Sequence, residues 1–443
     1  MESSHGRSSR SRRSGQNPAG SPGARSTTPQ YDGSLTMESG IKHSGKRALL
    51  HMPVEIVAMI VLEWTMLEWF APAIARQICR YLKQITDSSP HVWSKLSISF
   101  RSHATAHDVG KWLKRSRSVP KEILLQTNSI DIVRAALEGA KDATSLLYRV
   151  PVHPEEVIQL PIQMPRLRHL HLDTPRNKIF VNMSDIFGLH NPSCLVTLPC
   201  LTILNLFFID VTDFHIAPGL FPVIRRLVLH SVYGPILDLV RVCSRTLEHL
   251  RVSMNFTYDI ENYPHGPICL PNLKVLFVEY TWKFVSNLET PAVRLIHGHL
   301  LDIYGYTRPF SSLVEWVTRS GVRIPREIDI TDNLKNMPNL RHLMISQHIR
   351  TLQQCFASLR DNPSICPYLQ SIEVVDFTDI KLNLAYKAYL KACVAWRAEK
   401  IPGFTLRFVE NDVQKTRVDE YYEYYDEVSL FIVMRHYLSH HAF

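Results

Sequence analysis

A short apolar phrase, leucine-x-x-leucine-x-leucine with isoleucine or valine as substitutes, recurs through the middle of this 443-residue chain. A proline or another turn residue stands shortly before most copies. The copies are LRHLHL from Leu167, LTILNL from Leu201, IRRLVL from Ile224, LEHLRV from Leu247, LKVLFV from Leu273, LRHLMI from Leu340 and LQSIEV from Leu369. The alternation at the end of each phrase has a period of two, which predicts a strand with one apolar face.

The spacing of this phrase resembles that of a leucine-rich repeat. Successive copies begin 34, 23, 23, 26, 67 and 29 residues apart, and the interval of 67 leaves room for degenerate units near 291–296 and 324–330. In such arrays each unit contributes a strand and a helix, and it buries its apolar face only against its neighbours. The resemblance implies an α/β fold in which residues 161–380 form a curved solenoid with a parallel sheet.

Helices are expected between the strands, and a terminal cap is expected after the last one, because the open ends of a solenoid must be covered. The expected helices lie at 236–243, 313–318 and 352–359. The cap, residues 381–443, is expected to contain a helix past Leu382, a strand at 404–408 and a final helix at 430–438.

The residues between the leucines should line the concave face of the sheet, because side chains alternate between the two faces of a strand. Basic, aromatic and apolar side chains are mixed there, which suits the binding of a protein surface or a peptide. The predicted target-binding residues are His169, His171, Asn205, Phe207, Arg226, His249, Arg251, Phe277, His342 and Met344. The histidines follow the spacing of the repeat, so we interpret them as partly exposed strand positions rather than as metal ligands or a pH switch.

Residues 52–96 form a second distinctive segment. Pro53 suits the first turn of a helix, and eight large apolar side chains between Val54 and Trp64 leave that helix hardly any polar face. A second helix is expected to begin near Pro72. A unit of about 45 residues buries too little surface to be stable alone. The segment therefore needs the following chain or a partner, and we expect exposed Val, Ile and Met side chains on its first helix.

Several short stretches of this segment resemble an F-box. MPVEI from Met52 is similar to the L-P-x-E-I opening of that module, while ICRYL from Ile78 and SPHVW from Ser89 resemble its later V-C-R-x-W and S-x-x-x-W stretches. WLKRS from Trp112 and PKEILL from Pro120 resemble the segment that often follows an F-box in mushroom-type fungal proteins. The resemblance implies that residues 50–100 are a helical module that docks on the Skp adaptor of a cullin-RING ubiquitin ligase.

The resemblance also implies a function and a set of contact residues. The implied adaptor-binding residues are Pro53, Glu55, Ile56, Ile60, Ile78, Leu82 and Trp93. The chain would be a substrate-recognition subunit that holds the adaptor, and through it a cullin, while the concave face holds an unknown target protein. The alternative is a repeat scaffold in which the F-box-like segment only caps the solenoid. Met52 and Leu82 depart from the pattern, since leucine and tryptophan are usual there.

The net charge of +9 does not indicate a nucleic-acid surface on the folded part, because residues 1–47 carry eight basic and three acidic side chains. Those residues are rich in Ser, Gly, Arg and Pro, and we interpret them as a disordered basic tail. The cluster from Arg10 to Arg13 is either a nuclear-import signal or, as we prefer, solvated tail. Residues 101–160 are expected to be a linker with a strand and a helix, the helix at 130–148.

Other functional classes find little support. The eight cysteines form no C-x-x-C pair, which disfavours a zinc site or a disulfide framework. Gly40 begins a G-x-x-x-x-G-K phrase, but Arg47 replaces the Ser or Thr that would hold magnesium. Glu55, Glu63 and Glu68 interrupt the longest apolar run before it could span a membrane.

No catalytic signature such as G-x-S-x-G or H-E-x-x-H is present, so we expect no intrinsic catalysis and no cofactor. A hydrolase with a dispersed site is the third, least favoured class. There is no apolar signal segment at the N-terminus. We therefore expect a cytoplasmic or nuclear protein that uses no membrane anchor and works by binding other proteins.

Overall fold

The structure is a computed structural model in which two compact units are distinguished, Met1–Met52 and Pro53–Phe443. It describes residues 52–67, 70–100, 103–150, 156–161, 163–175, 180–188, 198–214, 221–253, 266–279, 284–299, 308–319, 330–345, 349–376 and 384–410. The predicted basic tail, the predicted final helix at 430–438 and nearly all of the degenerate unit at 324–330 lie outside these residues.

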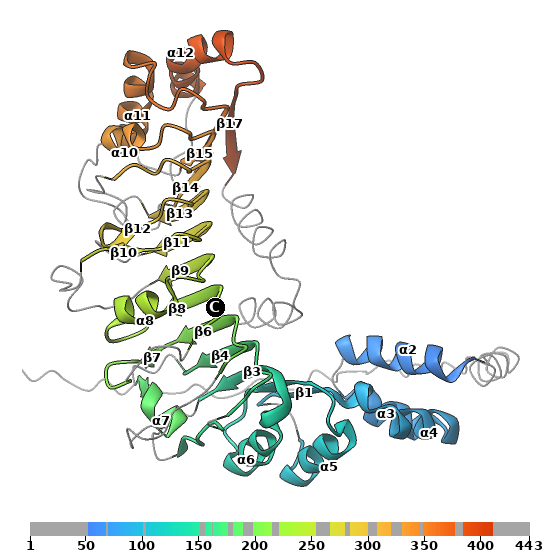
Figure 1. Ribbon diagram of the computed structural model, residues 1–443. Helices are drawn as coiled ribbons and strands as arrows, with labels where there is room; N and C mark the ends of the chain where they lie inside the picture. The colour runs from blue at the N-terminus through green and yellow to red at the C-terminus, as the bar shows by residue number, and fades with distance from the viewer. Residues whose placement is uncertain are drawn as a thin grey trace, which may run out of the picture. The chain divides into compact units, whose positions relative to one another are not determined.

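A single sheet of 13 strands organises the second unit, and its strands follow one another in chain order (Figure 1). All strand pairs in it are parallel. Its strands are β1 (Lys95–Ile98), β2 (Lys121–Leu125), β3 (Ala143–Arg149), β4 (His169–Asp173), β6 (Ile203–Phe207), β8 (Arg226–His230), β9 (His249–Ser253), β11 (Val275–Glu279), β13 (Leu295–His299), β14 (Glu315–Arg319), β15 (His342–Ile345), β16 (Ser371–Asp376) and β17 (Thr405–Glu410). The predicted α/β class with a parallel sheet is confirmed, and the sheet is open because β1 and β17 are its two edges.

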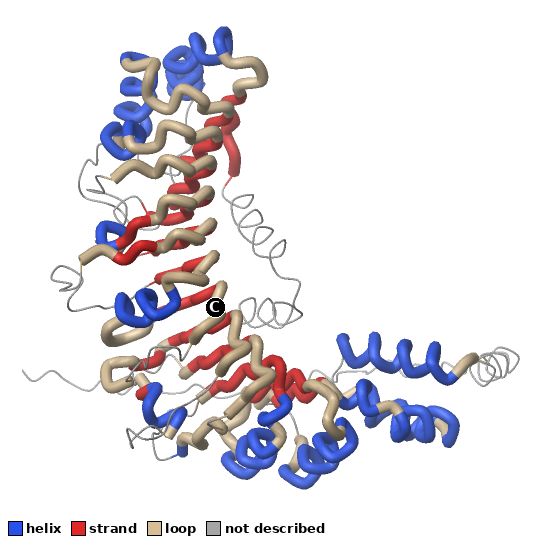
Figure 2. Tube along the Cα trace, in the orientation of Figure 1, coloured by secondary structure: helices blue, strands red, loops and turns tan. Residues whose placement is uncertain are grey.

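Two small parallel pairs lie outside the main sheet. They are β5 (Val181–Asn182) with β7 (Ile209–Asp210), and β10 (Ile268–Cys269) with β12 (Leu288–Glu289). Helices occupy several of the segments that connect one strand of the main sheet to the next, which we call return segments. Helices α7, α8, α10 and α11 lie on one side of the ladder of strands (Figure 2). The return segments include α5 (Ala106–Ser116), α6 (Ile130–Glu138), η2 (Ala140–Asp142), α7 (Met183–Phe187), α8 (Ile236–Cys243), η4 (Val285–Asn287), α10 (Thr331–Lys335), α11 (Ile349–Asp361) and α12 (Leu384–Lys400).

A repeated turn precedes six of the 13 strands of the sheet. In six described turns a backbone N–H donates to the carbonyl three residues earlier, and a proline stands at the second position, where its fixed φ favours the turn. The turns run from Met164 to Leu167, Leu198 to Leu201, Leu270 to Leu273, Thr290 to Val293, Met337 to Leu340 and Cys366 to Leu369. Each turn delivers a buried apolar residue two positions before the strand starts. This is the first leucine of the phrase or its equivalent.

Two asparagines in these turns join neighbouring units. Asn272 Nδ2 donates to the carbonyl of Arg245 over 2.7 Å, and Asn339 Nδ2 donates to the carbonyl of Ser311 over 2.6 Å. The strand phrases do not indicate these two asparagines, because both lie in the turns that precede the strands.

The strand leucines point to the core, and Leu170, Leu204 and Leu227 illustrate this with 1% exposed surface or less. The residues between them occupy the opposite side, which we call the inter-leucine face. Strand register places a middle row along this face that runs Ser97, Leu124, Leu147, His171, Asn205, Val228, Arg251, Phe277, His297, Val317, Met344, Glu373 and Arg407. A second row, two residues earlier in each strand, contains His169, Arg226, His249 and His342.

The N-terminal helices precede the sheet. They are α2 (Val54–Leu67), α3 (Ala71–Ile78), α4 (Arg80–Ser88) and the 3-10 turn η1 (Pro90–Trp93). The second helix expected from the sequence is divided in two, because Cys79 is extended (φ −159°, ψ 165°) and its Sγ accepts the N–H of Leu82 at the start of α4. None of the described helices is both long and apolar enough to cross a membrane.

Several boundaries differ from the sequence-based expectations. The helix expected at 313–318 is wrong, because β14 lies there with Trp316 fully buried on its core side. The helix expected at 130–148 ends at Glu138, and Leu146 and Leu147 belong to β3. The stretch 101–160 therefore contributes two strands to the sheet. Helices at 236–243 and 352–359 and a strand over 405–408 are confirmed.

Candidate functional site

Helix α2 packs against α3, α4 and η1. Val57 and Val61 are buried, and so is Thr65, whose hydroxyl donates to the carbonyl of Val61 over 2.7 Å. These residues are four apart, so they form one stripe along the helix. This stripe is the packed side of α2, and Ala71 and Ala75 of the neighbouring α3 are buried as well.

Outside this stripe α2 exposes several large apolar side chains together with Glu55 and Glu63. The exposed fractions are 45% for Val54, 43% for Ile56, 59% for Met59 and 46% for Ile60. Ile78 at the end of α3 is 59% exposed. The predicted exposure of Val, Ile and Met side chains on this helix is confirmed. We call Val54, Ile56, Met59 and Ile60 the α2 outer face.

The implied adaptor-binding residues divide into two groups. Pro53, Glu55, Ile56, Ile60 and Ile78 are exposed, and the Pro53 carbonyl accepts the N–H groups of the first helical turn. The other two are corrected. Leu82 is 6% exposed and Trp93 only 1%, so they build the interior of the segment and offer a partner no surface.

Trp93 is fixed by three contacts. Its Nε1 donates to the carbonyl of Thr86 over 2.7 Å, its ring meets that of Trp112 edge-on at 4.6 Å, and the Arg115 guanidinium lies 4.7 Å above it. A buried tryptophan whose N–H is satisfied and whose ring is stacked is a core residue. It fastens the N-terminal helices to α5.

The inter-leucine face is partly closed by contacts among its own side chains. His171 stacks on Phe207 with ring centroids 4.8 Å apart, and Phe207 lies 5.4 Å from His230. Further along, the Arg251 guanidinium lies 4.4 Å from the Phe277 ring, which meets His297 edge-on. Towards the C-terminal end, Val317, Met344 and Val375 form a buried apolar cluster.

The predicted target-binding residues therefore differ in what they can contact. His171, Phe277 and Met344 are buried, so the prediction that they meet a target is not supported by their exposure. His342 is exposed, with Nδ1 2.8 Å from the Ser371 hydroxyl. The half-buried residues of the set are His169, Asn205, Phe207, Arg226, His249 and Arg251. These six lie on the neighbouring strands β4, β6, β8 and β9, and together with His230 we call them the β4–β9 patch.

Burial keeps the histidines of this region neutral. Desolvation lowers the pKa of His171 to about 4. Desolvation, assisted by the nearby Arg226, lowers the pKa of His249 to about 4 as well. The pKa of His169 is lowered mainly by burial. At neutral pH these imidazoles are therefore uncharged, and the positive charge of the patch comes from its two arginines.

Two polar atoms, one on His171 beside the patch and one on Asn205 within it, have no hydrogen-bond partner among the described residues. They are Nδ1 of His171 and Oδ1 of Asn205, which face each other across β4 and β6 in register. A buried polar atom without a partner costs about 1–3 kcal/mol. A bound molecule that offered N–H groups here would remove that cost.

Among the described residues no group of three or more His, Cys, Asp or Glu side chains could hold a metal ion. The class defined by the fold is thus an open parallel α/β protein with an apolar helix face and a separate aromatic and basic patch. No protein-family model matches the sequence, and no curated protein matches it.

Proposed function

We propose that this protein is a substrate-recognition subunit of a cullin-RING ubiquitin ligase. In this role the α2 outer face docks on a Skp-type adaptor, and through it a cullin, while the β4–β9 patch binds the target protein. The observation that carries the proposal is that α2 exposes four large apolar side chains in addition to the stripe that it buries. The protein would act in the cytoplasm or the nucleus, and it would supply binding rather than catalysis.

The α2 outer face has enough apolar surface to contribute usefully to docking. Complete burial of a large aliphatic side chain contributes about 1.5–3 kcal/mol, so about half of that remains available for each half-exposed one. The four side chains of the face together offer roughly 3–6 kcal/mol, before the loss of rotational and translational freedom is subtracted. That is a substantial part of a micromolar affinity, about 8 kcal/mol.

The β4–β9 patch supports the second half of the proposal. Arginine and aromatic side chains are the residues most often found at the energetic centre of protein interfaces. Phe207, Arg226 and Arg251 are of this kind and keep part of their surface exposed. An acidic target segment would fit this combination.

The alternative is a scaffold in which the N-terminal helices merely cap the sheet. The contact between Trp93 and Trp112 favours it, since it fastens these helices to α5. That contact involves only buried residues, however, and it does not explain why α2 exposes apolar side chains. The adaptor experiment below distinguishes the two functions.

The test is co-purification of a Skp-type adaptor with the full chain. We expect the wild type to retain the adaptor and the double variant Ile56→Asp/Ile60→Asp to lose it by at least about tenfold, because two buried contacts would be replaced by desolvated carboxylates. The matched control is Leu384→Asp on α12, an apolar side chain that is 87% exposed and remote in sequence. Failure of the wild type to retain the adaptor, under conditions that hold a known F-box protein, would leave the scaffold function.

A further inference from the structure

A pocket of about 610 Å³ lies where α3, η1, β1 and α5 meet. Its apolar lining is provided by Trp93, Leu96, Ile98, Val109 and Trp112, all of which are largely buried. Phe70 adds an exposed ring to the lining. Small-molecule sites typically measure about 300–1,000 Å³ and are lined mainly by apolar and aromatic side chains. The size and the lining of this pocket agree with that description.

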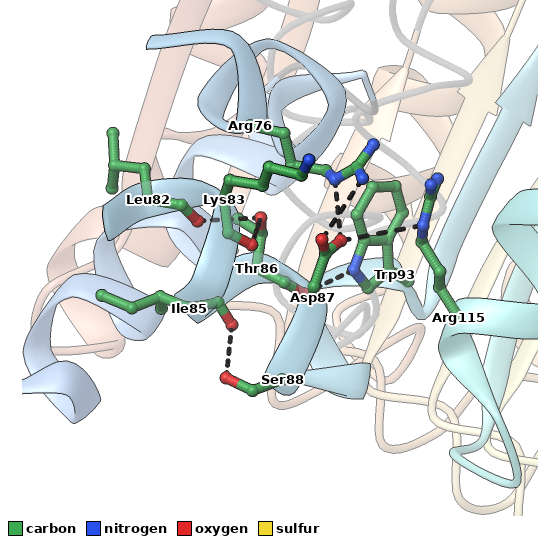
Figure 3. Close-up of polar contacts among 9 residues, drawn as sticks. All are labelled: Arg76, Leu82, Lys83, Ile85, Thr86, Asp87, Ser88, Trp93 and Arg115. Carbon is green, nitrogen blue, oxygen red and sulfur yellow. Dashed lines mark hydrogen bonds and ion pairs between the residues drawn. The ribbon is translucent and has the colours of Figure 1, made fainter. Parts of the chain in front are cut away.

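The same pocket carries a concentration of positive charge. Arg76 from α3 and Arg115 and Lys111 from α5 line it. Figure 3 shows the two guanidinium groups beside Trp93 and the carboxylate of Asp87 between them. Arg115 lies 4.7 Å and Arg76 6.0 Å from the centre of the Trp93 ring.

Asp87 neutralises this charge only in part. It lies 2.7 Å from Nε of Arg76 and 3.8 Å from Nε of Arg115, so one carboxylate faces two guanidinium groups. Arg76 donates a hydrogen bond to it from Nη2 over 3.2 Å. The Nε–H of Arg76 makes no hydrogen bond despite the short distance, so its alignment with the oxygen is poor.

The acidic residue of the lining itself, Asp108, is committed elsewhere. Asp108 accepts the backbone N–H of Thr105 over 3.1 Å and its hydroxyl over 2.7 Å, which completes the cap at the start of α5. Those two hydrogen bonds lower the pKa of Asp108. The pKa of Arg115 is lowered first by burial and then by the charge of Arg76, so an excess of positive charge remains at these two arginines.

We propose that this pocket binds a small planar aromatic anion, such as an aromatic carboxylate or sulfonate. The rings would lie against the exposed ring of Phe70, at the mouth of a pocket whose deeper wall contains the buried Trp93 and Trp112, and the anionic group would meet Arg76, Arg115 and Lys111. A guanidinium group matches a carboxylate well because two parallel N–H groups can point at its two oxygens. Nothing in this inference depends on the adaptor or the target.

The experiment is isothermal titration calorimetry of the full chain with 2-naphthoate and with 2-naphthamide, which has the same rings and no charge. We expect naphthoate to bind and naphthamide to bind at least about tenfold more weakly, because the charge-assisted hydrogen bonds are missing. Arg115→Gln should lower the naphthoate affinity about tenfold and change that for naphthamide less than about twofold.

Two further variants separate binding from folding. Arg134→Gln is the matched control, since Arg134 is an exposed arginine of α6 outside the pocket lining, and it should leave both affinities unchanged. Lys111→Glu alters an exposed lysine and tests the charge without touching the ion pairs, in case Arg115→Gln unfolds. Lys111→Glu should lower the affinity for naphthoate and leave the affinity for naphthamide unchanged.

Three results would overturn the proposal. The first is equal affinity for naphthoate and naphthamide, and the second is no heat from either at about 1 mM. The third is an Arg115→Gln variant that melts at a lower temperature but binds both compounds as the wild type does. That last result would mean that the arginines serve only to hold α3, α4 and α5 together.

Discussion

The buried Arg397 provides a test of what stabilises the C-terminal end of the sheet. The side chain extends from α12 and has no exposed surface. It donates from Nη1 to the carbonyl of Cys366 over 2.8 Å and from Nη2 to that of Ile365 over 2.5 Å. Cys366 begins the turn before β16 with φ of 47°, a left-handed conformation that is unfavourable for a residue other than glycine. Arg397 therefore holds that turn in place.

Two effects of opposite sign decide the stability of Arg397→Met. Removal of the guanidinium leaves the Ile365 carbonyl without its donor, at about 1–3 kcal/mol, and takes one of two donors from the Cys366 carbonyl, which keeps the N–H of Leu369. It also removes a buried cation whose desolvation costs several kcal/mol, and burial already lowers the pKa of Arg397. Nε of Arg397 has no hydrogen-bond partner among the described residues, but Nη1 and Nη2 each donate to a carbonyl and the guanidinium lies 4.6 Å from the Trp396 ring. We therefore expect the lost contacts to outweigh the relief. The expected destabilisation is about 2–4 kcal/mol.

Urea denaturation followed by circular dichroism measures this change, and hydrogen exchange of β16 locates it. Arg397→Lys keeps the charge but not the planar arrangement of N–H groups. Its free energy of unfolding should therefore fall by about half as much as that of Arg397→Met. Arg134→Met on α6, whose ion pair with Asp131 is exposed, should change the free energy of unfolding by less than about 0.5 kcal/mol. A variant Arg397→Met as stable as the wild type would refute the reasoning, because the buried cation would then cost as much as its hydrogen bonds contribute.

Three other predictions concern the helix face, the histidines and one glycine. Val57→Asp should lower the melting temperature by several degrees while Ile60→Asp leaves it nearly unchanged, because Val57 is 1% exposed and Ile60 is 46% exposed. Stability should fall as the pH drops from 6.5 to 4, since the unfolded chain protonates His171 before the folded one does, and His171→Phe should flatten that slope in urea titrations. Gly234→Ala should destabilise the protein by at least about 1 kcal/mol in the same assay, because Gly234 has φ of 105° and a Cβ would lie 2.7 Å from the Thr212 nitrogen.

The strands carrying the leucine phrase were predictable because their two faces differ. All seven phrases coincide with strands of the sheet, from β4 to β16. In residues 101–160 one strand was expected where the sheet has two, and β3 was assigned to a helix, because the pattern of β2 and β3 does not alternate cleanly. In β2 both Leu124 and Leu125 are buried, and Lys121 is buried too, with its ammonium donating to the carbonyl of Arg117. Such runs cannot be distinguished from a helix segment by periodicity.

The binding surfaces were less predictable from the sequence than the strands. An excess of apolar residues on α2 indicated a face that needs covering, and the structure exposes that face. A sequence motif does not tell whether its residues contact a partner or the interior, and for Leu82 and Trp93 the interior was correct. The pocket at Trp93 could not be found from the sequence, because its walls come from four elements and no phrase joins them.

The exposed Ile78 and the pocket lie on different sides of α3. Arg76 lines the pocket, whereas Ile78, two residues later, is exposed. Two residues along an α-helix correspond to a rotation of about 200°, so these side chains leave the helix in nearly opposite directions. A ligand at Arg76 and a partner that covers Ile78 would therefore not compete for the same atoms. Any influence of one on the other would require a movement of α3 itself, which the buried residues Ala71 and Ala75 oppose.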